Sequence, residues 1–398
     1  KNKIEELYQQ RSRQGFRMIA VCYKVLNNDK HSSLIVNEHQ MIFAGFVLLF
    51  DPPKAGVIEI IQTLQKNAVE LKVITGDNRL VAAYIAEQIG MQKINIISGS
   101  EITDISPEAL VQKVQQANVF AEIEPQQKEN IVRALRKAGN VVAYMGDGIN
   151  DVAAINAADV GISTNNAVDV AKEAADVVLL EKDLAVLNTG IIEGRKIFLN
   201  TLKYIYTSTG ATFGNMFSMA GASLILPFLP MLPQQILLTN FLTDFPYVSV
   251  ASDNVDKDQL KTPHKWNIEQ LKKFMIVFGL HSSIFDFLTF FSLYKIFHAD
   301  EAVFHTGWFV ESICTELLIL FVMRTRKSII KSLPGKLLLM LSVFALFITL
   351  VLPFTPIAAM LGLVVPPYQL LIVVSGILIL YVVTADILKI VFFKKTAI

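Results

Sequence analysis

The stretch VVAYMGDGIND, residues 141–151, changes abruptly from apolar residues to glycines and acids. Its first five residues predict a buried strand, and Gly146 and Asp147 predict a turn at the carboxyl end of that strand. The two glycines let backbone N–H groups approach a ligand closely, and Asp147 can hold Mg²⁺. Asp151 is expected to begin the next helix and to fix the magnesium shell through hydrogen bonds.

Strand and helix patterns alternate on both sides of this stretch. Strands are predicted at 41–50, 71–74, 141–145, 160–162 and 177–180, and helices at 55–67, 78–90, 125–138 and from 151 onward. Short strands separated by helices predict a parallel, doubly wound α/β sheet. Ligands of such sheets lie outside the carboxyl ends of the strands, where the polar clusters of this sequence fall.

Two further clusters suit phosphoryl transfer from an aspartyl phosphate. Thr75-Gly76-Asp77 follows the strand at 71–74, and Lys128 lies three residues into the helix that Pro125 opens. Thr75 can donate to a phosphate oxygen, and Lys128 can neutralise the spreading charge. Taken singly, the first cluster is more typical of a capped turn and Lys128 of a solvated helix lysine. The hypothesis therefore depends on all the clusters occurring together.

Composition divides the chain into two regions. The 36 Lys and Arg nearly balance the 35 Asp and Glu, which argues against a basic surface for nucleic acid. Hydrophobic residues make up 53% and mean hydropathy is +0.46, and most of this excess follows Phe198. Cys22 and Cys314 lie far apart, so a disulfide framework is excluded and a reducing cytosol suits the first region. The N-terminus resembles neither a signal peptide nor a start, so we expect the chain to begin within a longer protein.

Six apolar stretches follow, each near the roughly 20 residues that cross about 30 Å of hydrocarbon. They lie at about 204–226, 231–251, 274–297, 307–323, 337–353 and 368–392. Lys and Arg gather in the loops after the second and fourth stretches and in the C-terminal tail, and the alternate loops carry none. This asymmetry predicts six spans with the first region and the C-terminus in the cytosol.

Polar residues inside these stretches are candidates for an ion path, because burying them in a bilayer is costly. Their oxygens suit a hard cation such as Mg²⁺ or Ca²⁺, although Asn240 and Thr243 could also form a helix–helix hydrogen-bond patch. The candidate ligands of a transported cation are Asn240, Thr243 and Asp244 in the second stretch and Thr212 and Asn215 in the first. Three further acids, Asp286, Glu311 and Glu316, are equally compatible with ion ligands and with structural partners.

The motifs together resemble the phosphorylation domain of P-type ATPases, which has the haloacid dehalogenase-like, Rossmann-like fold. The resemblance is carried by Asp51-Pro52-Pro53-Lys54, by Thr75-Gly76-Asp77, by Phe120 to Pro125 with Lys128, and by Gly146 to Asp151. It implies the end of a nucleotide-binding domain at 1–40, a phosphorylation domain at 41–196 and a six-helix transmembrane domain at 197–398. Segments 238–245, 253–256 and 282–286 resemble the magnesium-transporting branch.

The resemblance implies ATP-driven transport of a cation, Mg²⁺ first, across the plasma membrane through an aspartyl-phosphate cycle, with ATP and Mg²⁺ as cofactors. It implies catalytic roles for Thr75, Gly76, Asp77, Lys128, Asn150 and Asp151, of which all but Asp151 would also bind nucleotide or phosphate. It implies catalytic Mg²⁺ at Asp147 and Asp151. Separately from the resemblance, no proline interrupts residues 183–217, so we expect residues 183–197 to lead nearly directly into the first span.

One motif of the resembled family is missing. The phosphorylated aspartate belongs to an Asp-Lys-Thr-Gly-Thr sequence that does not occur here. Asp51 follows an apolar strand, but Pro52 and Pro53 offer no N–H to a phosphoryl group. We therefore expect the nucleophile upstream and no ATP turnover by this chain alone. A calcium-type pump, a membrane-tethered phosphatase with Asp51 as nucleophile and a non-catalytic channel or regulatory subunit are the alternatives.

Overall fold

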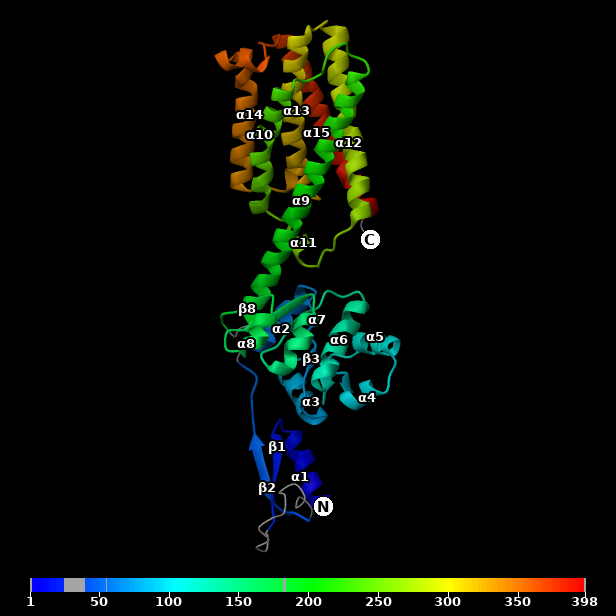
Figure 1. Cartoon of the computed structure of the whole chain (residues 1–398), viewed down its shortest axis with the longest axis vertical. Coiled ribbons are helices and arrows are strands. Elements are labelled where there is room, and N and C mark those ends of the chain that lie inside the picture. Colours follow the sequence, from blue (N-terminus) through cyan, green and yellow to red (C-terminus); the bar gives the residue numbers. More distant parts are fainter. Residues whose placement is uncertain (1, 25–39, 55, 182–183, 397–398) are drawn as a thin grey trace. The chain divides into compact units, whose positions relative to one another are not determined.

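The computed structural model describes residues 2–24, 40–54, 56–181 and 184–396. The chain divides into two compact units, 1–191 and 192–398. Each unit is described by itself below, with the elements labelled as in Figure 1. The expected domain bounds at 40 and 196 remain predictions, and Asp183 and residues 25–39 lie outside the described residues.

Six short strands of the first unit form two parallel sheets. One sheet has the order β3-β5-β4, from Val73–Ile74, Val119–Ala121 and Ile96–Ser98. The other has the order β6-β7-β8, from Ala143–Met145, Val160–Thr164 and Val177–Leu179. All pairings in both sheets are parallel, as the alternation of strands and helices predicts.

The two sheets contact the same apolar cores. Ile74 from β3 and Val142, just before β6, each contact both of the large apolar cores of this unit. Among the described residues, β3 pairs with β5 alone and β6 pairs with β7 alone. Each of these two strands therefore presents one edge whose backbone N–H and C=O groups have no strand partner.

The helices of this unit begin at the residues that the sequence indicates. They are α2 (Val57–Lys66), α3 (Arg79–Gln88), α4 (Gly99–Thr103), α5 (Pro107–Gln116), α6 (Pro125–Lys137), α7 (Val152–Ala157) and α8 (Asp169–Ala174). The Asn78 side chain caps α3 by accepting hydrogen bonds from the N–H groups of Leu80 and Val81. Pro125 stands in the first turn of α6, where its missing N–H costs nothing. The helices predicted at 55–67, 78–90 and 125–138 are confirmed.

The predicted strand at 41–50 exists but has a different partner. It is β2 (Ile42–Leu49), and it pairs antiparallel with β1 (Arg17–Tyr23), which follows α1 (Asn2–Ser12). Its expected membership of the parallel sheet was therefore wrong. Pairing with a preceding segment leaves no trace in the local apolar pattern, which is the same for either sheet.

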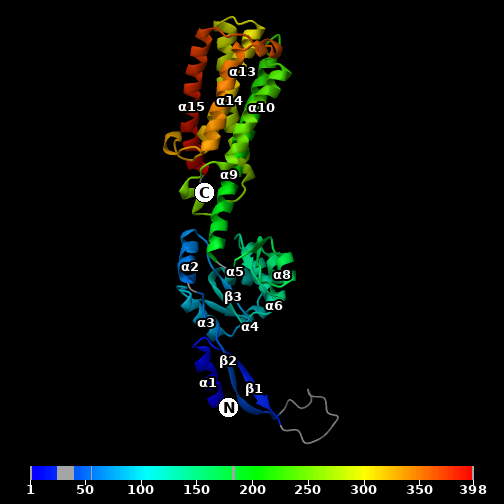
Figure 2. The same ribbon diagram turned by 90° about the vertical axis from the view of Figure 1, so that its left-hand side faces the viewer.

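Six helices lie near the places where the sequence predicts spans, and Figures 1 and 2 show them side by side. They are α9 (Leu184–Ser223), α10 (Pro233–Ser249), α12 (Ile268–Phe291), α13 (Glu301–Met323), α14 (Lys336–Val351) and α15 (Tyr368–Thr396), with a short α11 (Lys257–Leu260) between α10 and α12. The continuous α9 agrees with the expected direct run of residues 184–197 into the first apolar stretch.

Four of these helices are long and apolar enough to cross a membrane. Within the described residues these are 268–296, 301–323, 336–354 and 368–395. The remaining two predicted spans, in α9 and α10, are not confirmed. Helix α10 has only 17 residues, and the last part of α9 is rich in Thr, Ser, Gly and Asn. The six-span count therefore remains a prediction.

Helix α13 is the centre of this bundle, because it contacts α10, α12, α14 and α15. Its Trp308, Phe309 and Ile313 are fully buried in the main apolar core. Helices α9 and α12 approach closely at glycines. A Cβ on Gly214 would lie 3.1 Å from the Gly279 carbonyl oxygen, and a Cβ on Gly279 would overlap the Phe213 ring. Small residues at this contact thus let the two helix backbones approach closely.

Candidate functional site

In the first unit (1–191), below called the soluble unit, a cluster of polar side chains surrounds Asp151, which lies between β6 and α7. We call this group the soluble cluster. Lys128 of α6 donates from Nζ to Asp151 Oδ1 at 2.8 Å, and the Tyr144 hydroxyl donates to the same oxygen at 2.8 Å. The Gly148 N–H donates to Oδ2 at 3.2 Å. The structure thus joins Lys128 to the predicted 146–151 turn, although the two are far apart in the sequence.

A glycine is required at position 146 by this arrangement. A Cβ on Gly146 would overlap the Cβ of Asp151. The Gly146 N–H donates to the Ile162 carbonyl at 3.1 Å, and the Ser163 hydroxyl donates to the Gly146 carbonyl at 3.0 Å. The turn is therefore fixed to β7 on one side and closed over Asp151 on the other.

The partners of Asp151 keep it ionised. Burial raises the pKa of the Asp151 carboxyl, but hydrogen bonds from Lys128 and Tyr144 and the charge of Lys128 outweigh burial and bring this pKa below its ordinary value. Burial and the nearby Asp151 carboxylate raise the pKa of the Tyr144 phenol, which therefore remains a donor. The result is a partly buried ion pair with an extra hydrogen bond.

The predicted magnesium ligands differ in how they fit that role. Asp147 and Asn150 are exposed at the carboxyl end of β6, where a cation can reach them. Both oxygens of Asp151 already accept hydrogen bonds from the protein. Asp151 thus suits a positioning residue better than a direct ligand. Within the described residues, no group of three or more His, Cys, Asp or Glu side chains could hold a metal.

Thr75 and Asp77 form a separate pair after β3. The Thr75 hydroxyl donates to Asp77 Oδ2 at 2.9 Å and accepts from the Asp77 N–H at 3.1 Å. Arg17 of β1 binds both oxygens of the same carboxylate, at 2.7 and 2.8 Å. Gly76 is exposed between them. The predicted convergence of Thr75 and Lys128 on one phosphoryl group remains a prediction.

Two members of these clusters were not predicted. Arg17 lies in β1, and nothing in its local sequence points to Asp77. Tyr144 is one more bulky residue in an apolar strand, and only its hydroxyl distinguishes it from its neighbours. Asp51, the nucleophile of the phosphatase alternative, is exposed just beyond the antiparallel β2. It therefore does not follow a parallel strand, the position that this alternative requires.

A cavity of about 270 Å³ lies in the helix bundle between α9, α10 and α13. All five predicted ligands line it, and α13 adds three residues. The polar lining consists of Tyr204, Ser208, Thr212, Asn215, Thr239, Asn240, Thr243, Asp244, Tyr247, Trp308, Ser312 and Glu316. The structure therefore brings together the candidate ion ligands that the sequence placed on two separate helices.

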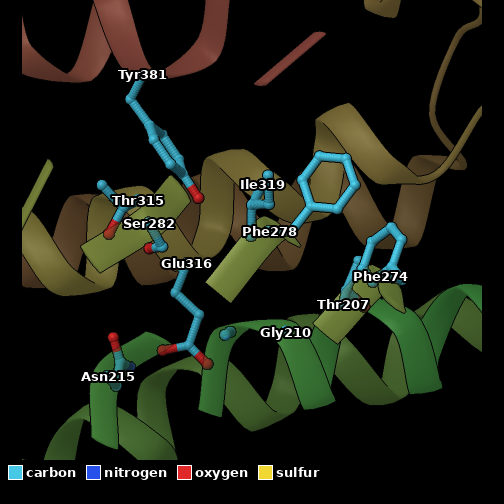
Figure 3. Close-up of a pocket in the computed structure, with 11 residues that line it drawn as sticks. Thr207, Gly210, Asn215, Phe274, Phe278, Ser282, Thr315, Glu316, Ile319 and Tyr381 are labelled. Carbon is cyan, nitrogen blue, oxygen red and sulfur yellow. The ribbon is translucent and has the colours of Figure 1, made fainter. Parts of the chain in front are cut away.

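Glu316 belongs to this cavity, although the sequence left its role open. A second cavity of about 10 Å³, room for about one water, shares Asn215 and Glu316 with the first. Figure 3 shows the Glu316 carboxylate pointing toward α9, with Asn215 nearby. It interacts with the side chains of Thr243 and Asn215, while its Oε2 has no hydrogen-bond partner among the described residues. Its five-residue spacing from Glu311 was the only signal that the two acids face different surroundings.

Comparisons with known proteins agree with both parts of the chain. The family described as the C-terminus of cation transporting ATPases matches residues 228–391. The family of haloacid dehalogenase-like hydrolases matches residues 21–159.

Individual relatives are ion-transporting ATPases. The magnesium-transporting P-type ATPase 1 of Escherichia coli K12 is 41% identical over 366 residues, covering 91% of this chain and 41% of the relative. The protein of the same name from Salmonella typhimurium 14028s is 40% identical over 383 residues, covering 95% and 42%. The calcium-transporting ATPase 1 of Bacillus cereus is 32% identical over 314 residues, covering 76% and 35%. The chain spans about two fifths of the length of the magnesium-transporting relatives.

Proposed function

This chain belongs to the P-type cation-transporting ATPases, and we propose that it forms the C-terminal part of a pump that carries Mg²⁺ across a membrane. Its apolar helices and its relatives make it an integral membrane protein. The observation that carries the proposal is the oxygen-lined cavity between α9, α10 and α13. The similarity to magnesium-transporting relatives supports Mg²⁺ over Ca²⁺ as the transported cation.

The cavity has the chemistry of a site for a hard divalent cation. Asp244 and Glu316 supply two carboxylates, and Asn215, Asn240 and Thr243 supply amide and hydroxyl oxygens. Mg²⁺ prefers such oxygen ligands and keeps several waters, for which a cavity of about 270 Å³ has room. Two acids and no lysine or arginine among the lining residues give the cavity a negative charge that attracts a cation.

The cavity is open on one side in this chain. Thr212, Asn240 and Asp244 are exposed, and polar side chains facing lipid at the depth of a span are costly. We propose that helices from a preceding part of the same protein cover this side and complete the site.

The soluble cluster supports a matching role for the other unit. Lys128, oriented by Asp151, would neutralise charge on a phosphoryl group, and Thr75 would donate to one of its oxygens. Members of this family use ATP and Mg²⁺. Asp147 would hold that Mg²⁺, which when bound offsets the negative charge of the phosphoryl group.

The nucleophilic aspartate is proposed to lie outside this chain, because the 398 residues hold no Asp-Lys-Thr-Gly-Thr motif. The free edges of β3 and β6 support this idea. A strand from the preceding part could pair with both edges and join the two parallel sheets into one. Its carboxyl end would then place an aspartate near Lys128 and Thr75.

The sidedness of the bundle follows from its charges. Lysines and arginines follow α10 and α13 and end α15, whereas the segments on the opposite side carry only Lys295, at the end of the candidate span 268–296. We propose that the charged side and the soluble unit face the cytosol, with the protein in the plasma membrane.

Asp244→Asn tests the function directly in the complete protein. Mg²⁺-stimulated ATP hydrolysis and Mg²⁺ uptake into vesicles should both need about tenfold more Mg²⁺, because the substitution removes one carboxylate ligand. Asp258→Asn is the matched control, since Asp258 is an exposed acid paired with Lys327 outside the cavity. Unchanged Mg²⁺ dependence in Asp244→Asn would show that the cation binds elsewhere, and stimulation by Ca²⁺ alone would reassign the ion.

A further inference from the structure

A second pair of acids lies in the helix bundle, outside both cavities. Asp286 of α12 is 1% exposed. Its Oδ2 accepts a hydrogen bond from the Ser218 hydroxyl of α9 at 2.6 Å, and its Oδ1 accepts one from the indole N–H of Trp308 at 3.0 Å. An indole N–H can only donate, so Asp286 acts as an acceptor on that oxygen. Both oxygens of Asp286 are therefore engaged by donors.

Glu311 of α13 lies beside the Asp286 carboxyl but, unlike Asp286, receives no hydrogen bonds from described residues. It is 0% exposed, and neither of its oxygens has a hydrogen-bond donor among the described residues. Asp286 is close enough to interact with it directly. The other ionisable groups that act on the pair are Cys314 and Glu316 of α13 and Tyr381 of α15. None of these three can carry a positive charge.

Two ionised carboxylates cannot share such a site. Neighbouring negative charges repel strongly when solvent is excluded, and each unpaired charge also loses its hydration. Acid pairs in this situation hold one proton between them. Since Asp286 already accepts from two donors, Glu311 is the member that gains by becoming a donor itself.

The same geometry excludes a metal ion as the occupant. Mg²⁺ requires about six oxygen ligands and usually keeps several waters. Asp286 and Glu311 line neither of the two cavities described above, and their described surroundings form no group that could hold a metal. A proton needs neither space nor further ligands.

We propose that Glu311 and Asp286 form a proton-binding site in the helix bundle, in which Glu311 carries the proton and Asp286 accepts from it. The shared proton links α12 to α13, and the hydrogen bond from Ser218 extends this link to α9. Trp308 connects this site to the cation cavity, because it lines the cavity and its indole N–H donates to Asp286.

Infrared spectroscopy of the complete protein in lipid at pH 7 tests the proposal. The wild type should show the carbonyl band of a protonated carboxylic acid, and Glu311→Gln should lose the part of this band that one acid contributes. Glu301→Gln is the matched control, since Glu301 is an exposed acid on the same helix and should leave the band unchanged. An unaltered band in Glu311→Gln would overturn the proposal.

Thermal unfolding provides an independent readout. Glutamine is a neutral analogue of a protonated glutamate, so Glu311→Gln should keep the midpoint close to that of the wild type. Asp286→Asn should lower the midpoint by several degrees, because an amide has one acceptor oxygen for two donors. If Glu311→Gln unfolds as early as Asp286→Asn or fails to fold, Glu311 is ionised and the proposal is wrong.

Discussion

Asp151 in the soluble unit and Glu311 in the helix bundle are both buried carboxyls, but the chain surrounds them differently. Asp151 accepts hydrogen bonds from Lys128, Tyr144 and the Gly148 N–H. Glu311 has no donor among the described residues and an acid as its neighbour. The first site holds a fixed negative charge beside a fixed positive one, and the second favours a neutral acid.

The two acids of the cavity, Asp244 and Glu316, have surroundings intermediate between those of Asp151 and Glu311. Asp244 and Glu316 line a polar cavity, and Oε2 of Glu316 has no hydrogen-bond partner among the described residues. A carboxylate held by protein donors is already satisfied, whereas one that faces a polar cavity can still take a ligand. The comparison therefore separates the acid proposed to orient phosphoryl chemistry from the acids proposed to bind the transported cation.

The largest effect is expected from removing the fixed positive charge of the soluble site. Lys128→Met in the complete protein should lower the rate of ATP turnover at least about a hundredfold, since a charge aimed at a reacting phosphoryl group typically contributes that much. The rate of phosphoenzyme formation measures this effect.

Lys137→Met is the control, because Lys137 is an exposed residue of the same helix α6. If both variants retain ATP turnover, Lys128 serves only to pair with Asp151, and its proposed role at the phosphoryl group is wrong.

A smaller effect is expected at the cavity. Glu316→Gln should raise the Mg²⁺ concentration for half-maximal ATPase activity about tenfold, because the amide keeps the shape of the side chain but removes its charge. Titration of ATPase activity with Mg²⁺ measures the shift. The Glu301→Gln variant should titrate like the wild type, and an unshifted Glu316→Gln curve would exclude this acid from the site.

The turn that carries Asp151 predicts a stability effect. Gly146→Ala should destabilise the soluble unit by about 1–3 kcal/mol, because the new methyl group would overlap Asp151. Gly148→Ala should cost far less, since a Cβ there has its nearest neighbour at 3.6 Å. Urea unfolding followed by circular dichroism measures both. Equal losses in the two variants would mean that the contact with Asp151 is not the cause.

Low pH should lower the stability of the soluble unit, because Asp151 becomes protonated. Its folded pKa lies below the unfolded value, so the carboxylate stabilises the fold above the unfolded pKa and loses this effect as pH falls through the folded one. The stability difference between wild type and Asp151→Asn should therefore be constant near neutral pH and shrink below about pH 4. A difference that stays constant down to pH 2 would contradict the ion pair.

Much of this fold follows from local patterns. The Asn78 cap of α3 and Pro125 of α6 mark the starts of these helices. The polar residues Asn240, Thr243 and Asp244 are recognisable as candidate ligands from their place in an apolar stretch. Local patterns do not show which distant segments of the chain pair or make contact. Each of three contacts joins segments that are 19 or more residues apart: the antiparallel pairing of β2 with β1, the bond from Arg17 to Asp77, and the place of Glu316 in the cavity.

The number of membrane spans is also difficult to predict from local sequence. Hydropathy identifies α12 to α15 well, since these helices meet lipid or pack on apolar neighbours. It does not identify α9 and α10, because polar residues such as those that line the cavity lower their mean hydropathy and α10 has only 17 residues. The residues proposed to bind the cation thus also weaken the signal for a membrane span.

Binding of Mg²⁺ to the complete purified protein tests the central claim most directly. We predict that calorimetric titration finds a class of Mg²⁺ sites that disappears in the double variant Asp244→Asn with Glu316→Gln and remains in Asp147→Asn. If the double variant binds as many Mg²⁺ ions, with the same affinity, as the wild type, the cavity between α9, α10 and α13 does not hold the transported cation.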